Sequence, residues 1–226
     1  MHKNIIITES QYKRLFEAAM DTFSLQELSN IPTFRGRMEY CKQQLGPVIG
    51  KGTGRMVFQI DDEKVLKLAM NPKGIAQNNE ERPDNYKNSM SLFPKCYEID
   101  ENEAWLVAEY VLPAKAEDIR KVTGMSPKQF FNVVYNLWHE RQGYNQQFNY
   151  WAYREIDKDE LWGLVEDYDS IFYEINDYLG NYDDVGVGDL VRLSSWGLAM
   201  RGGEPYLVIL DSGLTSEVYN SYYRRL

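Results

Sequence analysis

Residues 48 to 111 alternate between apolar and polar side chains, which is the pattern of β-strands with one buried face. Strands are predicted at 48–60, as a pair around a glycine turn, and at 64–70, 93–99 and 104–111. Residues 73–90 are polar and are expected to be partly helical, with Pro83 limiting the helix. This stretch therefore predicts a five-stranded antiparallel sheet, which Pro113 is expected to end.

Outside this stretch the apolar residues recur at helical spacing. Helices are predicted from Thr8 or Ser10 to about Met20, at 35–44, 115–122, 127–142 and 155–184, and after Thr215. The helix at 155–184 is expected to have a strongly acidic, solvated face. Two further strands are predicted at 195–200 and 205–210, so the fold class is α+β.

The change from strands to helices near residue 112 divides the chain. We expect a helical extension at 1–45, a mainly β part at 46–112 and a mainly helical part at 113–226. No Pro-rich or Gly-rich linker separates the last two parts, and there is no internal repeat.

Charge and composition narrow the classes of function. The chain has 34 Asp and Glu against 25 Lys and Arg, a net charge of −9. Such a chain lacks the basic surface that neutralises phosphate backbones, so nucleic acid is not expected as a partner. A membrane is not expected either, because no apolar run approaches the ~20 residues that span a bilayer. Cys41 and Cys96 are far apart and belong to no CxxC pair, which favours a reduced, cytoplasmic setting.

The turn between the first two strands contains three glycines, Gly50, Gly52 and Gly54, with Lys51 and Arg55 beside them. Glycine lets backbone N–H groups approach a polyphosphate closely, and the two cations would add charge. A glycine-rich hairpin is at least as often structural, so both interpretations stay open.

Lys67 lies inside the apolar strand at 64–70. A lysine in such a strand either extends to the sheet edge or meets an anion. A phosphate is one candidate anion, and Glu80 or Glu81 in the next segment would then orient the ammonium. Glu81 is the slightly better candidate because of the position of Pro83.

Two aspartates late in the chain complete the candidate chemistry. Asp211 follows the apolar strand at 205–210 and precedes Gly213, a position suited either to Mg²⁺ or to capping a turn. Asp189, in the run Gly188-Asp189-Leu190, is a candidate base or hydroxyl-orienting group.

The order of these pieces resembles the protein-kinase-like superfamily. By this resemblance Gly50 to Val57 is the phosphate-covering loop, Lys67 is the strand lysine, and Glu109 to Leu112, with Val111, is the hinge that contacts adenine. Asp189 is similar to the catalytic-loop aspartate, and Asp211 to the metal-binding aspartate of Asp-Phe-Gly.

The runs at 65–71, 74–78, 195–197 and 210–215 look like small kinase-like proteins of bacteriophage and marine metagenomic sequences. The resemblance implies a two-lobed fold, with the five-stranded sheet as amino-terminal lobe and a reduced helical carboxyl-terminal lobe. It also implies ATP and Mg²⁺ as cofactors, and host cytoplasm as the location if the protein is phage-encoded.

Departures from the family limit what the resemblance implies. Ser194 stands where kinases have the asparagine that binds a second Mg²⁺, and Gly188 stands in place of the arginine before the catalytic aspartate. With 13 residues after Gly213 in this sequence, no counterpart of the substrate-binding helices of a protein kinase is expected there. The expectation is therefore an ATP- and Mg²⁺-binding phosphotransferase with an unknown acceptor, more readily a small molecule than a protein. The alternative is an inactive pseudokinase that serves as a scaffold for a protein partner.

Overall fold

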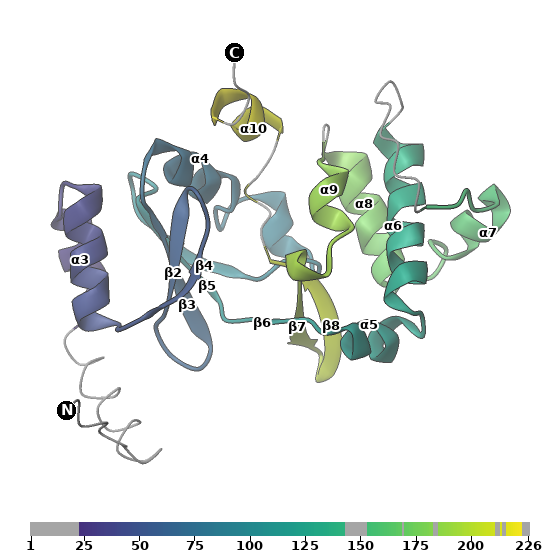
Figure 1. Ribbon diagram of the computed structural model, residues 1–226, viewed down its shortest axis with the longest axis horizontal. Helices are drawn as coiled ribbons and strands as arrows, with labels where there is room; N and C mark the ends of the chain where they lie inside the picture. The colour runs from purple at the N-terminus through teal and green to yellow at the C-terminus, as the bar shows by residue number, and fades with distance from the viewer. Residues whose placement is uncertain are drawn as a thin grey trace, which may run out of the picture. The chain divides into compact units, whose positions relative to one another are not determined.

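The computed structural model describes residues 23–142, 153–168, 170–182, 185–210, 213 and 216–222. These residues form two compact units (Figure 1). The first unit comprises residues up to Asn78 together with Glu98–Tyr110. The second comprises Asn79–Tyr97 and the described residues from Val111 onward. The helix predicted before residue 21 lies outside the described residues.

The predicted five-stranded antiparallel sheet is confirmed within the described residues. Its strands are β1 (Val48–Lys51), β2 (Arg55–Gln59), β3 (Lys64–Ala69), β4 (Cys96–Ile99) and β5 (Trp105–Glu109). They lie in the order β1-β2-β3-β5-β4, so β3 is the central strand. Short turns connect β1 to β2 and β2 to β3, because antiparallel neighbours need only a short connection.

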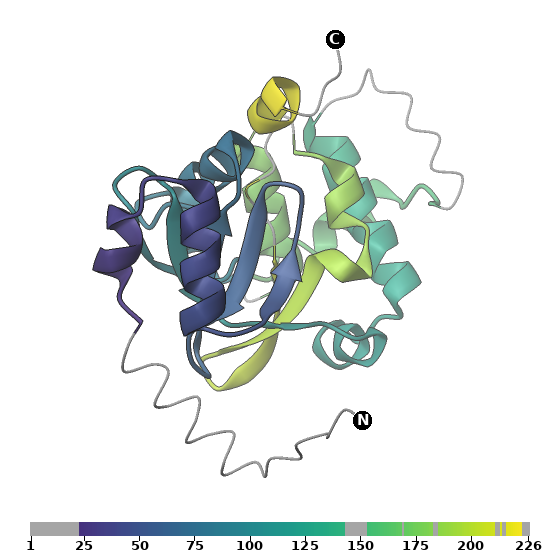
Figure 2. The ribbon, with the colours of Figure 1, turned by 60° about the vertical axis from the view of Figure 1, so that its left-hand side comes forward.

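One face of this sheet is covered by short helices. These are α2 (Leu25–Asn30) and α3 (Phe34–Gln44), of which α3 was predicted and α2 was not. The side chains of Ser24 and Thr33 accept hydrogen bonds from the first turns of α2 and α3, which fixes where each helix begins. Figure 2 shows α3 lying across the strands. The apolar core between helices and sheet consists of Leu28, Cys41, Leu45, Met56, Phe58, Leu66, Leu68, Ala104, Trp105 and Val107.

Helix α4 (Pro72–Glu80) follows β3 and occupies the start of the segment expected to be partly helical. It begins with a proline, which suits the first turn of a helix because the missing N–H has no partner there. It ends three residues before Pro83, and the 3₁₀ turn η1 (Tyr86–Ser89) follows.

The second unit contains the other sheet. Among the described residues it has three antiparallel strands, β6 (Leu112–Pro113), β7 (Trp196–Arg201) and β8 (Glu204–Ile209), in that order. Both strands predicted near the carboxyl end are therefore present. They form a hairpin whose turn residues Gly202 and Gly203 have φ of 59° and 91°, values that favour glycine. Strand β6 was not predicted, and its proline lies on an edge strand, where the missing N–H is tolerated.

The second unit also contains helices, and those before residue 191 share one apolar core with the three-stranded sheet. The helices are α5 (Ala116–Thr123), α6 (Pro127–Gln142), α7 (Lys158–Gly163), α8 (Ile171–Asn181), α9 (Val187–Leu190) and α10 (Ser216–Tyr222), with the 3₁₀ turn η2 (Leu193–Ser195). The fully buried members of their core include Phe130, Val134, Leu137, Ile175, Trp196 and Leu207. Helices α5 and α6 agree with the predictions to within one residue at each end.

The single acidic helix predicted at 155–184 is wrong. Two separate helices, α7 and α8, occupy this segment. Asp157 caps the first through its side chain, and Ser170 caps the second by accepting a hydrogen bond from the Phe172 N–H. The second cap, in the middle of the segment, starts a new helix. Both helices bury apolar residues in the same core, so apolar residues keep their helical spacing across the break, and the sequence looks like one helix.

The described residues contain no helix that is both long enough and apolar enough to cross a membrane.

Candidate functional site

Lys67 lies at the centre of the five-stranded sheet. Strand register places Gly50 of β1, Val57 of β2, Lys67 of β3 and Leu106 of β5 in one row. Successive side chains on a strand point to opposite faces, and the neighbours of Lys67 on β3, Leu66 and Leu68, belong to the apolar core. Lys67 therefore lies on the opposite face, where it is only 8% exposed. The alternative of an ordinary surface lysine does not fit this burial.

The three glycines of the β1–β2 turn have different surroundings. A Cβ on Gly54 would lie 2.4 Å from Gln77 Oε1 and 3.1 Å from the Gly74 backbone nitrogen, both on α4. The absence of a side chain at Gly54 is therefore explained by packing. A Cβ on Gly52 would meet no atom within 4 Å, and one on Gly50 would make only ordinary contact with Val57. Neither of these two has a positive φ.

The turn is tied to the end of β3. The Met70 N–H donates to the Gly54 carbonyl at 2.8 Å, and Asn71 Nδ2 donates to the Thr53 carbonyl at 3.0 Å. Asn71 Oδ1 in turn accepts from the Gly74 N–H in the first turn of α4. The glycine turn, the lysine-bearing strand and α4 are thus held together by direct hydrogen bonds inside the first unit.

Arg55, which follows the turn, is also buried, at 6% exposed. Its Nη1 donates to Asn78 Oδ1 at 3.3 Å, and Asn78 Nδ2 donates to the Glu103 carbonyl at 2.8 Å. Glu103 has a φ of 51°, in the left-handed region, in the β4–β5 turn. From the sequence, Arg55 was expected only to add charge, and Asn78 was not singled out, because a polar residue in a polar helix gives no signal of burial.

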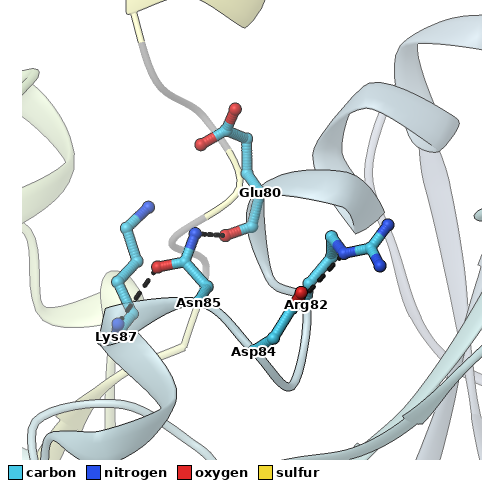
Figure 3. A network of polar contacts seen from close by, with 5 residues as sticks. All are labelled: Glu80, Arg82, Asp84, Asn85 and Lys87. Atoms are coloured by element: carbon cyan, nitrogen blue, oxygen red, sulfur yellow. Dashed lines mark hydrogen bonds and ion pairs between the residues drawn. The ribbon is translucent and has the colours of Figure 1, made fainter.

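Glu80 and Glu81 are the predicted partners of Lys67. Glu80 is the last residue of α4, and Glu81 follows the helix. The Glu80 carbonyl accepts from Asn85 Nδ2 at 3.1 Å, and Asn85 Oδ1 accepts from the Lys87 N–H at 3.1 Å (Figure 3). These contacts fold the chain sharply after α4. Glu81 is 9% exposed, so its carboxylate is nearly removed from solvent. Its ion pair with Lys67 stays a prediction.

The predicted hinge residues lie where β5 ends. Glu109 is its last residue and is opposite Lys64, and the Tyr110 N–H donates to the Glu63 carbonyl at 2.7 Å. Val111 is buried against Ala199 and Val208 of the three-stranded sheet. A contact of Glu109 or Val111 with adenine is a prediction that these contacts do not test.

The segment that carries Asp189 is anchored on both sides. Asp189 belongs to the short helix α9, whose residues Val187 and Leu190 are buried. Trp138 Nε1 donates to the Val185 carbonyl at 2.6 Å, and Trp196 Nε1 donates to the Leu190 carbonyl at 2.8 Å. Two buried indoles therefore fix the backbone before and after Asp189.

Ser194 lies in η2 and is exposed. Its neighbour Ser195 accepts a hydrogen bond through its carbonyl from the Leu210 N–H at 2.9 Å. The structure thus brings η2 beside the end of β8, the strand that precedes Asp211. Asp211 itself lies outside the described residues, so its predicted role as a Mg²⁺ ligand is not tested.

No protein-family model matches this chain, and a search of curated proteins gives no significant match.

Proposed function

We propose that this chain binds Mg-ATP in a protein-kinase-like fold and transfers a phosphoryl group to a small acceptor molecule. The observation that carries the proposal is Lys67, buried on the central strand in one row with Gly50 of the glycine turn. A lysine ammonium is a compact cation that binds phosphate oxygens. A phosphate group near the turn is a ligand of suitable charge.

The order of elements supports the same proposal. In protein kinases the phosphate-binding lysine lies on the third strand, and its glutamate lies on the helix that follows. Here Lys67 lies on β3, and α4 follows it directly and ends at Glu80. The glycines at 50 and 52 have no packing or conformational reason in the fold, which agrees with close approach of a ligand.

Each proposed residue has a defined role. Lys67 contacts the α and β phosphates, Glu80 or Glu81 orients its ammonium, and Glu109 and Val111 contact the base through the backbone. Asp189 orients the acceptor hydroxyl, and Asp211 with Ser194 would hold Mg²⁺. The metal, when bound, neutralises charge on the transferred group, so the residues act chiefly by positioning.

Thermal unfolding with and without Mg-ATP tests nucleotide binding. At ~100 times the dissociation constant a ligand adds about 2.7 kcal/mol, which corresponds to a shift in Tm of about 5 to 10 °C for a chain of this size. We expect this shift in the wild type and its loss in K67M and D211N.

The matched control is K42M. Lys42 is an exposed lysine in the last turn of α3, the helix that packs on the sheet face opposite Lys67. It should retain the shift. An equal Tm shift with Mg-ATP, or no shift, in the wild type and all three variants would contradict the proposal.

A pseudokinase is the second candidate, favoured by Ser194. A serine hydroxyl is a poorer ligand for a second metal ion than an amide oxygen, and Ser194 is exposed and thus free of any demand from the core. Single-turnover transfer from labelled ATP separates the two candidates. An active wild type excludes the pseudokinase, whereas nucleotide binding without turnover, with turnover gained in S194N, supports it.

A further inference from the structure

Two side chains of α6 bind both backbone polar groups of Val185, which precedes Asp189 in the chain. Trp138 Nε1 donates to the Val185 carbonyl at 2.6 Å, and the Val185 N–H donates to Gln142 Oε1 at 3.2 Å. Trp138 and Gln142 are spaced i and i+4, so they lie on the same face of α6. This face therefore fixes the peptide groups of Val185, from which the chain enters α9.

Gln142 also binds the end of the preceding helix, α8. Its Nε2 donates to the Leu179 carbonyl at 2.8 Å and to the Tyr182 carbonyl at 2.9 Å. Leu179 lies in the last turn of α8, where carbonyls have no partner inside the helix, and Tyr182 is the C-cap. The amide of Gln142 thus uses both its N–H groups and its oxygen, and this orientation alone matches two carbonyls and one N–H.

The neighbouring residue on α6 makes a contact of a different kind. Helix α6 packs against both α8 and α9 (Figure 1). Arg141 Nε donates to Asn176 Oδ1 at 2.6 Å, a bond that joins α6 to α8 and involves no atom of residues 185–190. Attachment of α6 to α8 and attachment of the Asp189 segment can therefore be changed separately.

We propose that Gln142 is a positioning residue for Asp189. It ties the end of α8 to the Val185 peptide, and the two indoles then hold the backbone between that peptide and the end of α9. Misplacement of a reacting group by about 1 Å can cost about a hundredfold in rate. The inference rests on the proposed function, in which Asp189 orients the acceptor hydroxyl. Gln142 acts through the backbone that carries Asp189 and touches none of the reacting atoms.

Amide hydrogen exchange of the full chain in the variant Q142E tests whether Gln142 holds the segment. The substitution keeps the size of the side chain and one oxygen for the Val185 N–H, but it replaces the two donors to carbonyls with an acceptor. Peptides covering residues 185–190 should exchange at least about tenfold faster than in the wild type, because two hydrogen bonds are lost. R141M, which removes the bond to Asn176, is the matched control and should leave this exchange unchanged. Unchanged exchange in Q142E would overturn the inference.

Release of phosphate from γ-labelled Mg-ATP tests whether that hold serves the reaction. Water takes the place of the acceptor hydroxyl, the β–γ phosphoanhydride bond breaks, and ADP and inorganic phosphate form. At a temperature where circular dichroism shows both variants folded, Q142E should lower kcat at least about tenfold and leave KM for Mg-ATP within about twofold. R141M should keep both constants even where its Tm falls as far as that of Q142E, which a merely structural role of Gln142 does not predict.

The two measurements separate this inference from the proposed function. If the wild type and Q142E release phosphate at the same rate although exchange is faster in Q142E, the function stands and the role of Gln142 fails. If the wild type neither binds nor cleaves Mg-ATP, the proposed function fails, and faster exchange in Q142E then leaves Gln142 as a structural contact alone. Should Q142E not fold, Q142N gives the same comparison, because its amide is too short to bind the end of α8 and Val185 together.

Discussion

The two faces of the five-stranded sheet are both buried, but they are chemically different. On one face Met56, Phe58, Leu66 and Leu68 pack under α2 and α3. On the other, the same strands β2 and β3 carry Arg55 and Lys67, each more than nine-tenths buried. The two sets alternate along the strands, so neighbouring residues of one strand belong to different environments.

This difference separates the residues that stabilise the fold from those assigned to binding. Burial of apolar area is the main favourable term in folding, and the apolar face supplies it. Replacing a complete buried ion pair with apolar residues of similar volume is often neutral or stabilising, whereas removing one partner leaves the other charge buried and is destabilising. Substitutions on the two faces should therefore affect different measurements.

Phe58→Ala should have the largest effect on the free energy of unfolding. Phe58 is fully buried, and truncation of a buried phenylalanine costs about 3–5 kcal/mol through lost burial and the cavity that remains. Urea denaturation followed by circular dichroism measures this change. Lys67→Met, on the opposite face, keeps most of the side-chain volume and should cost less stability than Phe58→Ala. A larger loss in Lys67→Met than in Phe58→Ala would remove the distinction between the faces.

Two alanine variants of the glycine turn, at Gly54 and Gly52, form a matched pair with a smaller expected effect on stability. Gly54→Ala places a Cβ against Gln77 and 3.1 Å from the Gly74 nitrogen, so it should cost about 1–3 kcal/mol of stability as an overpacked contact. Gly52→Ala meets no atom within 4 Å and should leave stability within about 0.5 kcal/mol. Chemical denaturation compares the two. Equal stability of the two variants would contradict the packing of the turn against α4.

The smallest expected effect is the pH dependence of stability that arises from Cys41 on the apolar face. Burial raises the pKa of the Cys41 thiol from its ordinary value of 9.0 to about 12. Between these values the unfolded chain loses the proton while the folded chain keeps it, so stability falls as pH rises above about 9. Denaturation midpoints between pH 8 and 10.5 should fall more steeply for the wild type than for Cys41→Ala. Parallel slopes would indicate a thiol in contact with water.

Local patterns in the sequence predicted most of the first unit. Alternation placed β1, β2 and β3, and the glycine turn with Lys67 followed from residue types at fixed spacing. Helix α6 was predicted at its observed bounds because its apolar period is long and regular. Helix α2 was missed although Ser24 and Glu27 are spaced as a cap, because six residues are too few to show a period.

Features that depend on distant residues were not predictable. Strand β6 has two residues, and it is a strand only because Leu112 and Pro113 pair with Leu198 and Gly197. The Asn78 contacts join residues 23 and 25 positions away. The role of Arg55 could not be separated from that of Lys51 before the register placed them on opposite faces. For Asp189 only the anchored backbone segment is now established.

The two indoles that hold the Asp189 segment give the protein an optical property. Trp196 has no solvent exposure, contacts the Phe130 ring edge-on at 5.0 Å and donates to the Leu190 carbonyl. The emission wavelength of an indole depends on the polarity around it and on the partner of its N–H. A shift of the α9 backbone would therefore change the colour of tryptophan emission. Because the chain has five tryptophans, the emission of Trp138 and Trp196, obtained by comparison with variants that lack each indole, reports on the segment that carries Asp189.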